Sequence, residues 1–215
     1  PYPANQLMKT SATDEDGNTT IEFSNGEGQT ILVRKNDGTQ HLDTYYLYNE
    51  YGQLAYVVPP LAVGNTVPDQ AALDNLCYQY RYDGMGKLVE KKIPGKGWEY
   101  LVYDRQDRVI MSQDANLGTT TKNSFAAKGW MFTKYDKFGR VVYTGFYPSV
   151  ETRAFLQNHV NNLAANPENN ETRSTNSFPN VGMDIFYTQN AFPSVGIRVL
   201  SVNYYDTYPS YPFNP

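Results

Sequence analysis

The stretch Tyr135-Asp136-Lys137-Phe138-Gly139-Arg140-Val141 is one of four copies of a seven-residue repeat that decides the fold of this 215-residue chain. Each copy begins with Tyr and continues with Asp or Asn. Gly or Asp stands at the fifth position, a long polar residue at the sixth, and Leu or Val at the seventh. A repeat indicates the architecture of a chain before any single residue is interpreted, so we base the prediction of the fold on it. The other copies are Tyr48-Asn49-Glu50-Tyr51-Gly52-Gln53-Leu54, Tyr82-Asp83-Gly84-Met85-Gly86-Lys87-Leu88 and Tyr103-Asp104-Arg105-Gln106-Asp107-Arg108-Val109.

Each copy has the composition of a turn between two strands. Asp or Asn can accept hydrogen bonds from nearby backbone N–H groups, and Gly three residues later tolerates a positive φ. Asp107 replaces Gly in the third copy, and Asp enters the left-handed region more readily than most residues. We therefore predict β-hairpins and assign a structural role to Tyr48, Asn49, Gly52, Tyr82, Asp83, Gly86, Tyr103, Asp104, Asp107, Tyr135, Asp136 and Gly139.

The flanking sequence favours a mainly β fold. Tyr78, Tyr80 and Tyr82 fall on one face of an alternating strand, and the chain's 19 tyrosines suit pleated, half-buried surfaces. Ser24-Asn25-Gly26-Glu27-Gly28-Gln29 is a degenerate copy with Ser in the tyrosine position. We expect a long curved antiparallel sheet of repeated hairpins, forming a single scaffold segment over residues 1–215.

Four segments depart from the hairpin pattern. We expect an irregular leader over 1–13 and a mobile polar loop over 166–179. A first inserted helix is predicted near 69–77, where Asp69 can cap. A second is predicted near 149–165, with Ser149 as its cap and a stripe of Leu156, Val160 and Leu163.

The residues that usually carry chemistry are sparse, and we predict no catalytic, cofactor or metal site and no enzyme activity. The net charge is −4 and the pI about 5.2, whereas a general nucleic-acid binder usually shows a basic patch. Cys77 is alone, so an intramolecular disulfide is excluded. Asp14-Glu15-Asp16-Gly17-Asn18 lacks the Gly and Glu positions of an EF-hand and is predicted to be a plain turn.

The repeats resemble the YD repeat of the bacterial Rhs family, which is related to toxin-complex shell proteins and animal teneurins. Longer blocks are similar to large Rhs-like proteins of Bacteroidetes, and the resemblance extends over residues 20–208. These blocks are Leu76-Cys77-Tyr78-Gln79-Tyr80-Arg81-Tyr82-Asp83, Val89-Glu90-Lys91-Lys92-Ile93-Pro94-Gly95, Trp98-Glu99-Tyr100, Gly129-Trp130-Met131-Phe132-Thr133-Lys134-Tyr135-Asp136, Tyr143-Thr144-Gly145 and Val202-Asn203-Tyr204-Tyr205-Asp206.

The resemblance implies an antiparallel sheet that spirals into a hollow shell around a C-terminal passenger, which is a toxin in polymorphic-toxin members. We accordingly expect a structural segment of a larger, secreted or cell-surface bacterial protein. Its partners would be other YD repeats of the same full-length chain and an encapsulated C-terminal domain. The family's core region with its aspartate-dependent self-cleavage site has no counterpart in this sequence.

The alternative is a carbohydrate- or protein-binding module that uses exposed aromatic rings, with Trp98 and Trp130 as the candidate platform. The location of the rings separates the two hypotheses, because a scaffold buries them and a binding face exposes them. No apolar run approaches the length of a transmembrane helix. Exposed sheet edges invite pairing, so we also expect the segment to self-associate through them.

Overall fold

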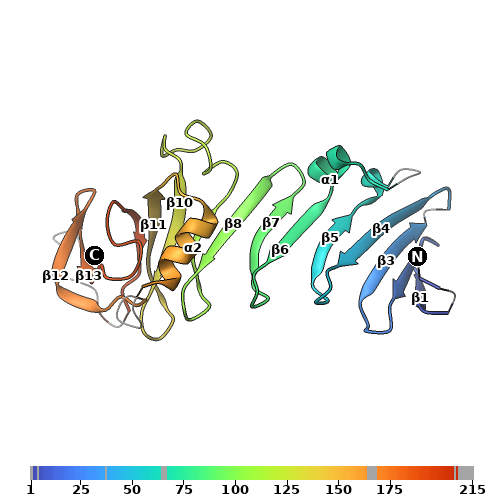
Figure 1. Cartoon of the computed structure of the whole chain (residues 1–215), viewed down its shortest axis with the longest axis horizontal. Coiled ribbons are helices and arrows are strands. Elements are labelled where there is room, and N and C mark those ends of the chain that lie inside the picture. The colour runs from blue at the N-terminus through green and yellow to red at the C-terminus, as the bar shows by residue number, and fades with distance from the viewer. Residues whose placement is uncertain are drawn as a thin grey trace. The chain divides into compact units, whose positions relative to one another are not determined.

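The computed structural model describes residues 2–3, 5–36, 38–63, 67–163, 169–205 and 207. Within these residues the chain is mainly β, as predicted, with a 12-stranded antiparallel sheet that does not close and a separate two-stranded sheet. The order of the large sheet is β1-β2-β3-β4-β5-β6-β7-β8-β9-β10-β11-β14 (Figure 1). Two compact units can be distinguished along the chain, Pro1–Trp98 and Glu99–Pro215.

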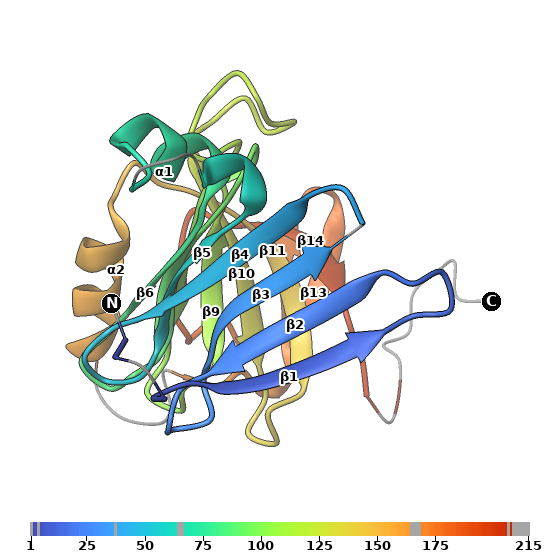
Figure 2. The same cartoon turned by 90° about the vertical axis from the view of Figure 1, so that its right-hand side faces the viewer.

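Unit 1 is a series of antiparallel hairpins with β1 as its outermost strand (Figure 2). The expectation of an irregular leader over 1–13 was wrong for its second half, because Met8–Thr13 forms β1. This polar strand gains its order from backbone pairing with β2 rather than from burial. The strands are β1 (Met8–Thr13), β2 (Thr19–Ser24), β3 (Thr30–Asn36), β4 (His41–Tyr48), β5 (Leu54–Val58), β6 (Tyr78–Tyr82) and β7 (Leu88–Ile93).

A helical insertion between β5 and β6 supplies much of the core of unit 1. It contains the 3-10 helix η1 (Pro60–Ala62) and helix α1 (Gln70–Leu76), which lies within the predicted range. Asp69 caps α1 by accepting a hydrogen bond from the N–H of Ala72 at 2.7 Å. The insertion packs on the sheet around a cluster of buried apolar side chains, namely Val58, Ala62 and Cys77.

Unit 2 consists of a sheet portion, one helix and a small hairpin. The strand β8 begins just before the boundary between the units. Helix α2 lies against the strands (Figure 1), with its Leu156 and Val160 buried in their core. The elements are β8 (Gly97–Tyr103), β9 (Val109–Gln113), β10 (Gly129–Tyr135), β11 (Val141–Pro148), α2 (Arg153–Asn161), β12 (Arg173–Asn180), β13 (Met183–Tyr187) and β14 (Arg198–Val202).

Two predictions in this unit need correction. Helix α2 begins after Thr152, whose hydroxyl accepts from the N–H of Phe155 at 3.3 Å, and not after Ser149. Ser149 instead accepts from the N–H of Glu151, which keeps that stretch out of the helix. Much of the predicted mobile loop over 166–179 is the strand β12, whose polar side chains need only a backbone partner in β13. Residues 164–168 lie outside the described residues.

The core of unit 2 is aromatic. The rings of Phe132 and Tyr143 meet edge to face with centroids 6.2 Å apart, and both side chains are buried. Gly145 makes this packing possible, because a Cβ at its position would lie 2.7 Å from the ring of Phe132. The close approach explains why Gly stands two residues after Tyr143 in the strand.

Candidate functional site: the ladder of repeat turns

Five turns that follow the sequence repeat share one geometry, and we call them the repeat turns. In the last of them, Asp136 Oδ1 accepts from the N–H groups of Phe138 at 2.9 Å and Arg140 at 3.0 Å. The fifth residue has a positive φ, 77° at Gly139 and 61° at Asp107. The predicted turn chemistry is therefore confirmed, including the degenerate copy. The repeat turns are residues 25–29, 49–53, 83–87, 104–108 and 136–140.

The turn between β1 and β2 uses the same local chemistry without the rest of the repeat. Asp14 Oδ1 accepts from the N–H groups of Asp16 at 3.1 Å and Asn18 at 2.8 Å, and Gly17 has a φ of 83°. This turn lies at the opposite end of β2 from residues 25–29, so we do not count it among the repeat turns. The carboxylate of Asp14 is used by the turn itself, as expected for a plain turn.

In the repeat turns at 25–29, 49–53, 104–108 and 136–140, the second and sixth residues also pair through their side chains. Asn49 donates from its amide to Gln53 Oε1 at 2.8 Å, and Asn25 does the same to Gln29. Where the second residue is Asp, the sixth is Arg in two turns, and the Arg Nε donates to Asp136 Oδ2 at 2.7 Å and to Asp104 Oδ2 at 2.8 Å. An amide thus pairs with an amide and a carboxylate with a guanidinium. This correlation is visible in the sequence, although our prediction did not use it.

Three of the repeat tyrosines connect their hairpin to the one before it. Tyr48, Tyr82 and Tyr135 each sit at a β-bulge, which redirects the side chain relative to the strand. The hydroxyl donates to the carbonyl of the seventh repeat residue of the preceding hairpin. The bonds are Tyr48 to Thr30 at 3.1 Å, Tyr82 to Leu54 at 2.9 Å, Tyr135 to Val109 at 2.8 Å and Tyr205 to Val141 at 2.9 Å.

These hydroxyls act where strand pairing stops. In the described pairings, strands of neighbouring hairpins pair through two to five residues, and those lie away from the repeat turns. Strand β9 meets β10 at Ser112 and Met111, for example, whereas the carbonyl that Tyr135 binds belongs to Val109. The tyrosine hydroxyl therefore satisfies a carbonyl that the ladder of strand pairs leaves out. Tyr205 serves the same role as Tyr48, Tyr82 and Tyr135, although it lies outside the four copies of the repeat that the sequence analysis counted.

The sixth residues connect the turns in the opposite direction. Gln29 Nε2 donates to the carbonyl of Gly52 at 3.0 Å, and Gln53 Nε2 to that of Gly86 at 3.3 Å. Arg108 Nη1 donates to the carbonyl of Asp136 at 3.3 Å. Together with the tyrosine bonds, these contacts form what we call the turn ladder, in which the motif residues of one hairpin bind the next.

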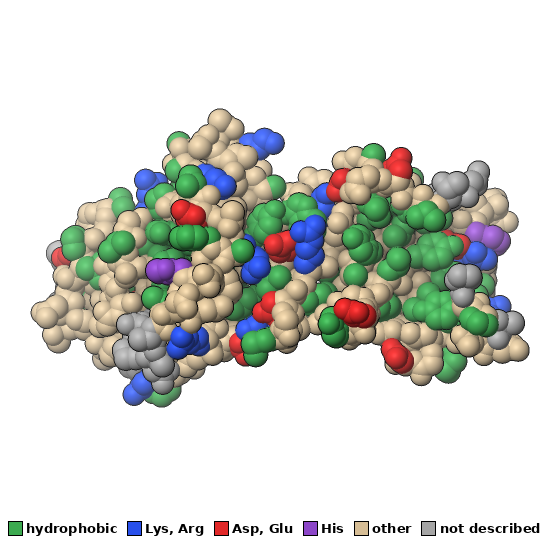
Figure 3. Space-filling view, viewed as in Figure 1, with side chains coloured by type: hydrophobic (Ala, Val, Ile, Leu, Met, Phe, Trp, Pro, Cys, Tyr) green, Lys and Arg blue, Asp and Glu red, His purple; other side chains and the backbone are tan. Residues whose placement is uncertain are grey.

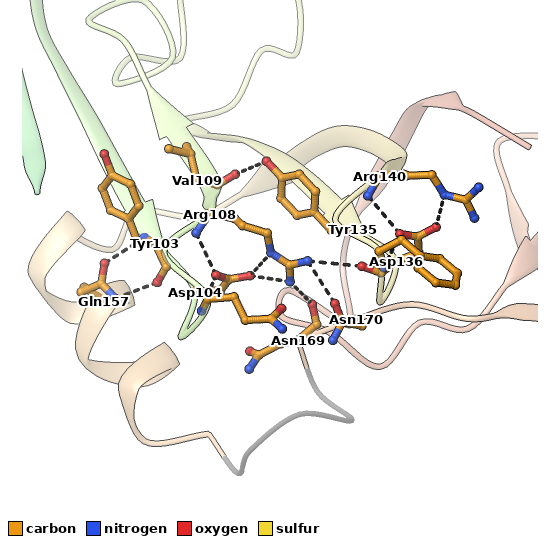
Figure 4. Close-up of polar contacts among 12 residues, drawn as sticks. Tyr103, Asp104, Arg108, Val109, Tyr135, Asp136, Arg140, Gln157, Asn169 and Asn170 are labelled. Atoms are coloured by element: carbon orange, nitrogen blue, oxygen red, sulfur yellow. Dashed lines mark hydrogen bonds and ion pairs between the residues drawn. The ribbon is translucent and has the colours of Figure 1, made fainter. Parts of the chain in front are cut away.

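Arg108 is the most connected member of the turn ladder (Figure 4). Its guanidinium pairs with the buried Asp104 at 2.6 Å and lies 4.6 Å from the centroid of the Tyr135 ring. It also donates to the carbonyl of Asn169 at 2.8 Å and to Asn170 Oδ1 at 3.1 Å. The segment before β12 is thereby attached to two repeat turns at once.

Helix α2 and the carboxylate of Asp136 also make hydrogen bonds near the repeat turns of unit 2. Gln157 accepts from the N–H of Tyr103 at 2.9 Å and donates to its carbonyl at 2.8 Å, as a neighbouring strand would (Figure 4). Burial tends to raise the pKa of Asp136, but the hydrogen bonds from Arg140 and Phe138 outweigh it and hold this pKa below its ordinary value.

A second polar cluster lies in the interior of unit 2. Lys134 pairs with Glu171 at 3.1 Å and donates to the carbonyl of Ala191, and both charged side chains are fully buried. Glu171 also accepts from Thr188 Oγ1 at 2.7 Å and from the N–H groups of Asn190 and Ala191 at 3.0 Å. Burial lowers the pKa of Lys134 to about 8. These contacts connect residues 171–191 to β10. No pattern in the sequence indicated that Lys134 and Glu171 would form a pair.

Trp98 and Trp130, the candidate platform for a ligand, do not form a surface of exposed rings. Trp130 is 1% exposed and belongs to the core of unit 2, so it offers no ring surface to a ligand. Trp98 is half-buried, and its ring contacts the Arg81 guanidinium at 4.3 Å and the Lys92 ammonium at 5.6 Å. The Trp98 ring therefore already makes cation–π contacts within the chain.

Unit 1 contains a groove that the sequence analysis did not predict. Its volume is about 920 Å³, and its lining includes Tyr2, Tyr45, Tyr46 and Tyr48 together with apolar residues of the insertion. Hydrophobic side chains are visible over the strands of this unit in Figure 3. The repeat tyrosines are half-buried rather than fully exposed, and burial raises the pKa of Tyr48, Tyr82 and Tyr135.

No protein-family model matches the sequence, and no curated protein has a similar sequence. In the part of the chain that the structure describes, no cluster of three His, Cys, Asp or Glu side chains could hold a metal ion. No described helix combines the length and apolar character needed to cross a membrane.

Proposed function

We propose that the chain is a structural scaffold, a section of a YD-repeat β-shell in a larger secreted or cell-surface bacterial protein that encloses or displays a C-terminal passenger. The turn ladder is the observation that carries the proposal. The defining residues of the repeat, Tyr at the first position and Gln or Arg at the sixth, bind the neighbouring hairpin.

This bonding pattern suits a wall that is extended by repetition. Within each unit, the hairpins of the turn ladder contact their neighbours through the same few groups, so stability can accumulate through nearest-neighbour interfaces, as in other repeat proteins. The motif residues whose contacts are described above are engaged by backbone carbonyls and by one another. That use supports a structural role for them and agrees with the resemblance to Rhs-type shells.

Proteolysis of the native full-length protein tests the proposal. Protease added to intact cells of the source bacterium should release peptides of this chain, with a cytosolic protein as the control. The region that follows this chain should resist protease until the scaffold unfolds. Peptides that appear only after cell lysis, or a following region that is cut while the scaffold remains folded, would contradict the proposal.

The groove of unit 1 supports a second candidate, a module that binds a carbohydrate or a peptide. Concave sites lined by aromatic rings with a few polar groups are typical of ligand pockets, and four tyrosines contribute to this lining. A glycan array and a peptide panel test the candidate. Binding that Tyr46→Ala abolishes at unchanged thermal stability would favour it, because the Tyr46 hydroxyl is not among the hydroxyls that form the turn ladder.

A further inference from the structure

The lining of the groove in unit 1 is aromatic and uncharged. Four tyrosines and six aliphatic or proline residues line it together with Gln29 and Asn49. None of these side chains carries a charge, so the groove offers no partner for a charged ligand. Its volume of about 920 Å³ is large enough for a ligand of several residues.

The two polar side chains of the lining are already used by the repeat turns. Gln29 Nε2 donates to the carbonyl of Gly52 at 3.0 Å, and Asn49 Nδ2 donates to Gln53 Oε1 at 2.8 Å. Asn49 Oδ1 accepts from the N–H groups of Tyr51 and Gln53. A sugar would bury many hydroxyl groups that need hydrogen bonds. The lining therefore favours a ligand that binds mainly through apolar surface.

Two of the tyrosine rings are held in place within unit 1 itself. The Tyr48 hydroxyl donates to the carbonyl of Thr30 at 3.1 Å, and the Tyr45 hydroxyl donates to Asp43 Oδ2 at 3.3 Å. The Tyr46 hydroxyl has no hydrogen-bond partner among the described residues, so it can donate to a ligand. Grooves lined by aromatic rings are the sites at which proline-rich segments dock in the polyproline II conformation.

The sequence contains a segment with the matching chemistry, Tyr208-Pro209-Ser210-Tyr211-Pro212-Phe213-Asn214-Pro215, which lies outside the described residues. Proline stands at every third position of it, at 209, 212 and 215. A polyproline II helix has three residues per turn, so prolines at this spacing share one face, about 9 Å apart. The segment contains no charged side chain, as the groove contains none. Polyproline II also makes no internal hydrogen bonds, so its carbonyls can accept from a tyrosine hydroxyl.

We propose that the groove of unit 1 binds residues 208–215 as a proline-rich segment in the polyproline II conformation. The prolines lie against the tyrosine rings, and the Tyr46 hydroxyl donates to a carbonyl of the segment. Proline spacing, the absence of charge on both sides and the aromatic lining are the arguments for this occupant. The inference rests on the second candidate function, the binding module, and names its ligand. Because proline restricts the free segment, little conformational entropy is lost on binding.

A synthetic peptide of residues 207–215 tests the proposal by isothermal titration calorimetry. It is titrated into the whole 215-residue chain carrying Pro209→Ala, Pro212→Ala and Pro215→Ala, which removes competition from the chain's own segment. We expect the peptide to bind, and a peptide with the same three substitutions to bind about tenfold more weakly, since alanine does not restrict the free peptide. Equal binding of the two peptides, or no binding of either, would overturn the proposal.

Two substitutions in the groove locate the bound peptide. Tyr46→Ala removes a ring and a donor, and Val67→Asp places a charge at an 88% exposed position of the lining. Each should weaken binding by about tenfold or more. Tyr56→Ala is the matched control, because Tyr56 belongs to unit 1 but does not line the groove. If Tyr46→Ala fails to fold, Val67→Asp alone decides. Binding that survives Val67→Asp unchanged, or that Tyr56→Ala weakens equally, would refute the groove as the site.

Failure of this inference can be told apart from failure of the binding module. A glycan or an unrelated peptide that binds in a Tyr46-dependent manner, while the peptide of residues 207–215 does not bind, would refute the proline-rich ligand and leave the module standing. A groove that binds none of these ligands would refute both.

Discussion

The hydroxyl of Tyr135 donates a hydrogen bond to the backbone carbonyl of Val109 at 2.8 Å, and so links two successive hairpins through a residue of the repeat. Tyr135→Phe keeps the ring and removes this bond. We expect a loss of about 1 kcal/mol in the free energy of unfolding, with a range of about 0.5–1.5 kcal/mol. Urea denaturation measures it. Tyr51→Phe, at a 78% exposed position of another repeat, is the control and should change little.

The fifth position of the repeat requires a left-handed backbone. Gly139 has a φ of 77°, and a Cβ there would meet no atom within 4 Å, so the cost of a side chain is purely conformational. Gly139→Ala should destabilise the protein by about 1–2 kcal/mol. Gly84→Ala is the control, because Gly84 lies in a repeat turn without a positive φ and with the same open space. Equal losses for both variants would contradict the assigned turn geometry.

The pairing of the second and sixth residues predicts a reciprocal exchange. Asp104→Asn alone, or Arg108→Gln alone, leaves a mismatched partner in a partly buried site. The double variant recreates the Asn–Gln pair that holds the turns at 25–29 and 49–53. In a double-mutant cycle we expect a favourable coupling energy of about 0.5–3 kcal/mol. Additive losses would show that the two positions act independently.

The buried pair in unit 2 should be sensitive to loss of one partner. Lys134→Met leaves Glu171 as an uncompensated buried charge and should cost about 3–5 kcal/mol. The double variant Lys134→Met/Glu171→Gln should recover part of this loss, because Gln carries no charge and its one carbonyl oxygen can still accept from the N–H of either Asn190 or Ala191. Thermal unfolding of the single and the double variant compares their stabilities. A double variant less stable than the single one would contradict the charge argument.

The same lysine gives a pH dependence of defined sign. Burial lowers its pKa from 10.5 to about 8 in the folded protein, so the unfolded chain binds more protons between these values. The contribution of Lys134 to stability therefore rises as the pH increases from about 8 towards 10.5. Lys134→Met should lack this rise when unfolding is compared at both ends of the window. An unchanged pH profile in the variant would contradict the lowered pKa.

The sequence predicted what is local and missed what is tertiary. Asp136 and Gly139 act within one turn, so their roles followed from residue type and spacing. The partner of Tyr135 lies in the preceding hairpin, and the contact between Lys134 and Glu171 joins β10 to a distant segment, so neither pairing has a local signal. Strand β12 was missed because its polar composition resembles a loop, and its order comes from β13 and from Asn180.

The burial of Trp130 follows from the same limitation. An aromatic residue in an alternating strand can face a core or a ligand, and only the covering layer decides which. In unit 2 that layer is supplied by α2 and by residues 169–197, whose placement depends on Arg108, Gln157 and Lys134. The candidate platform therefore could not be separated from the core by sequence alone.

The most direct test of the scaffold account is a spectrophotometric titration of the tyrosines in the folded protein. Burial raises the pKa of Tyr48, Tyr82, Tyr135 and Tyr143. Their contribution to stability is present below the ordinary tyrosine pKa and is lost as the pH rises through the higher folded values. We predict that these tyrosines ionise only together with cooperative unfolding at alkaline pH. Reversible ionisation of all 19 tyrosines near their ordinary pKa, with the fold intact, would contradict the account and favour an exposed binding face.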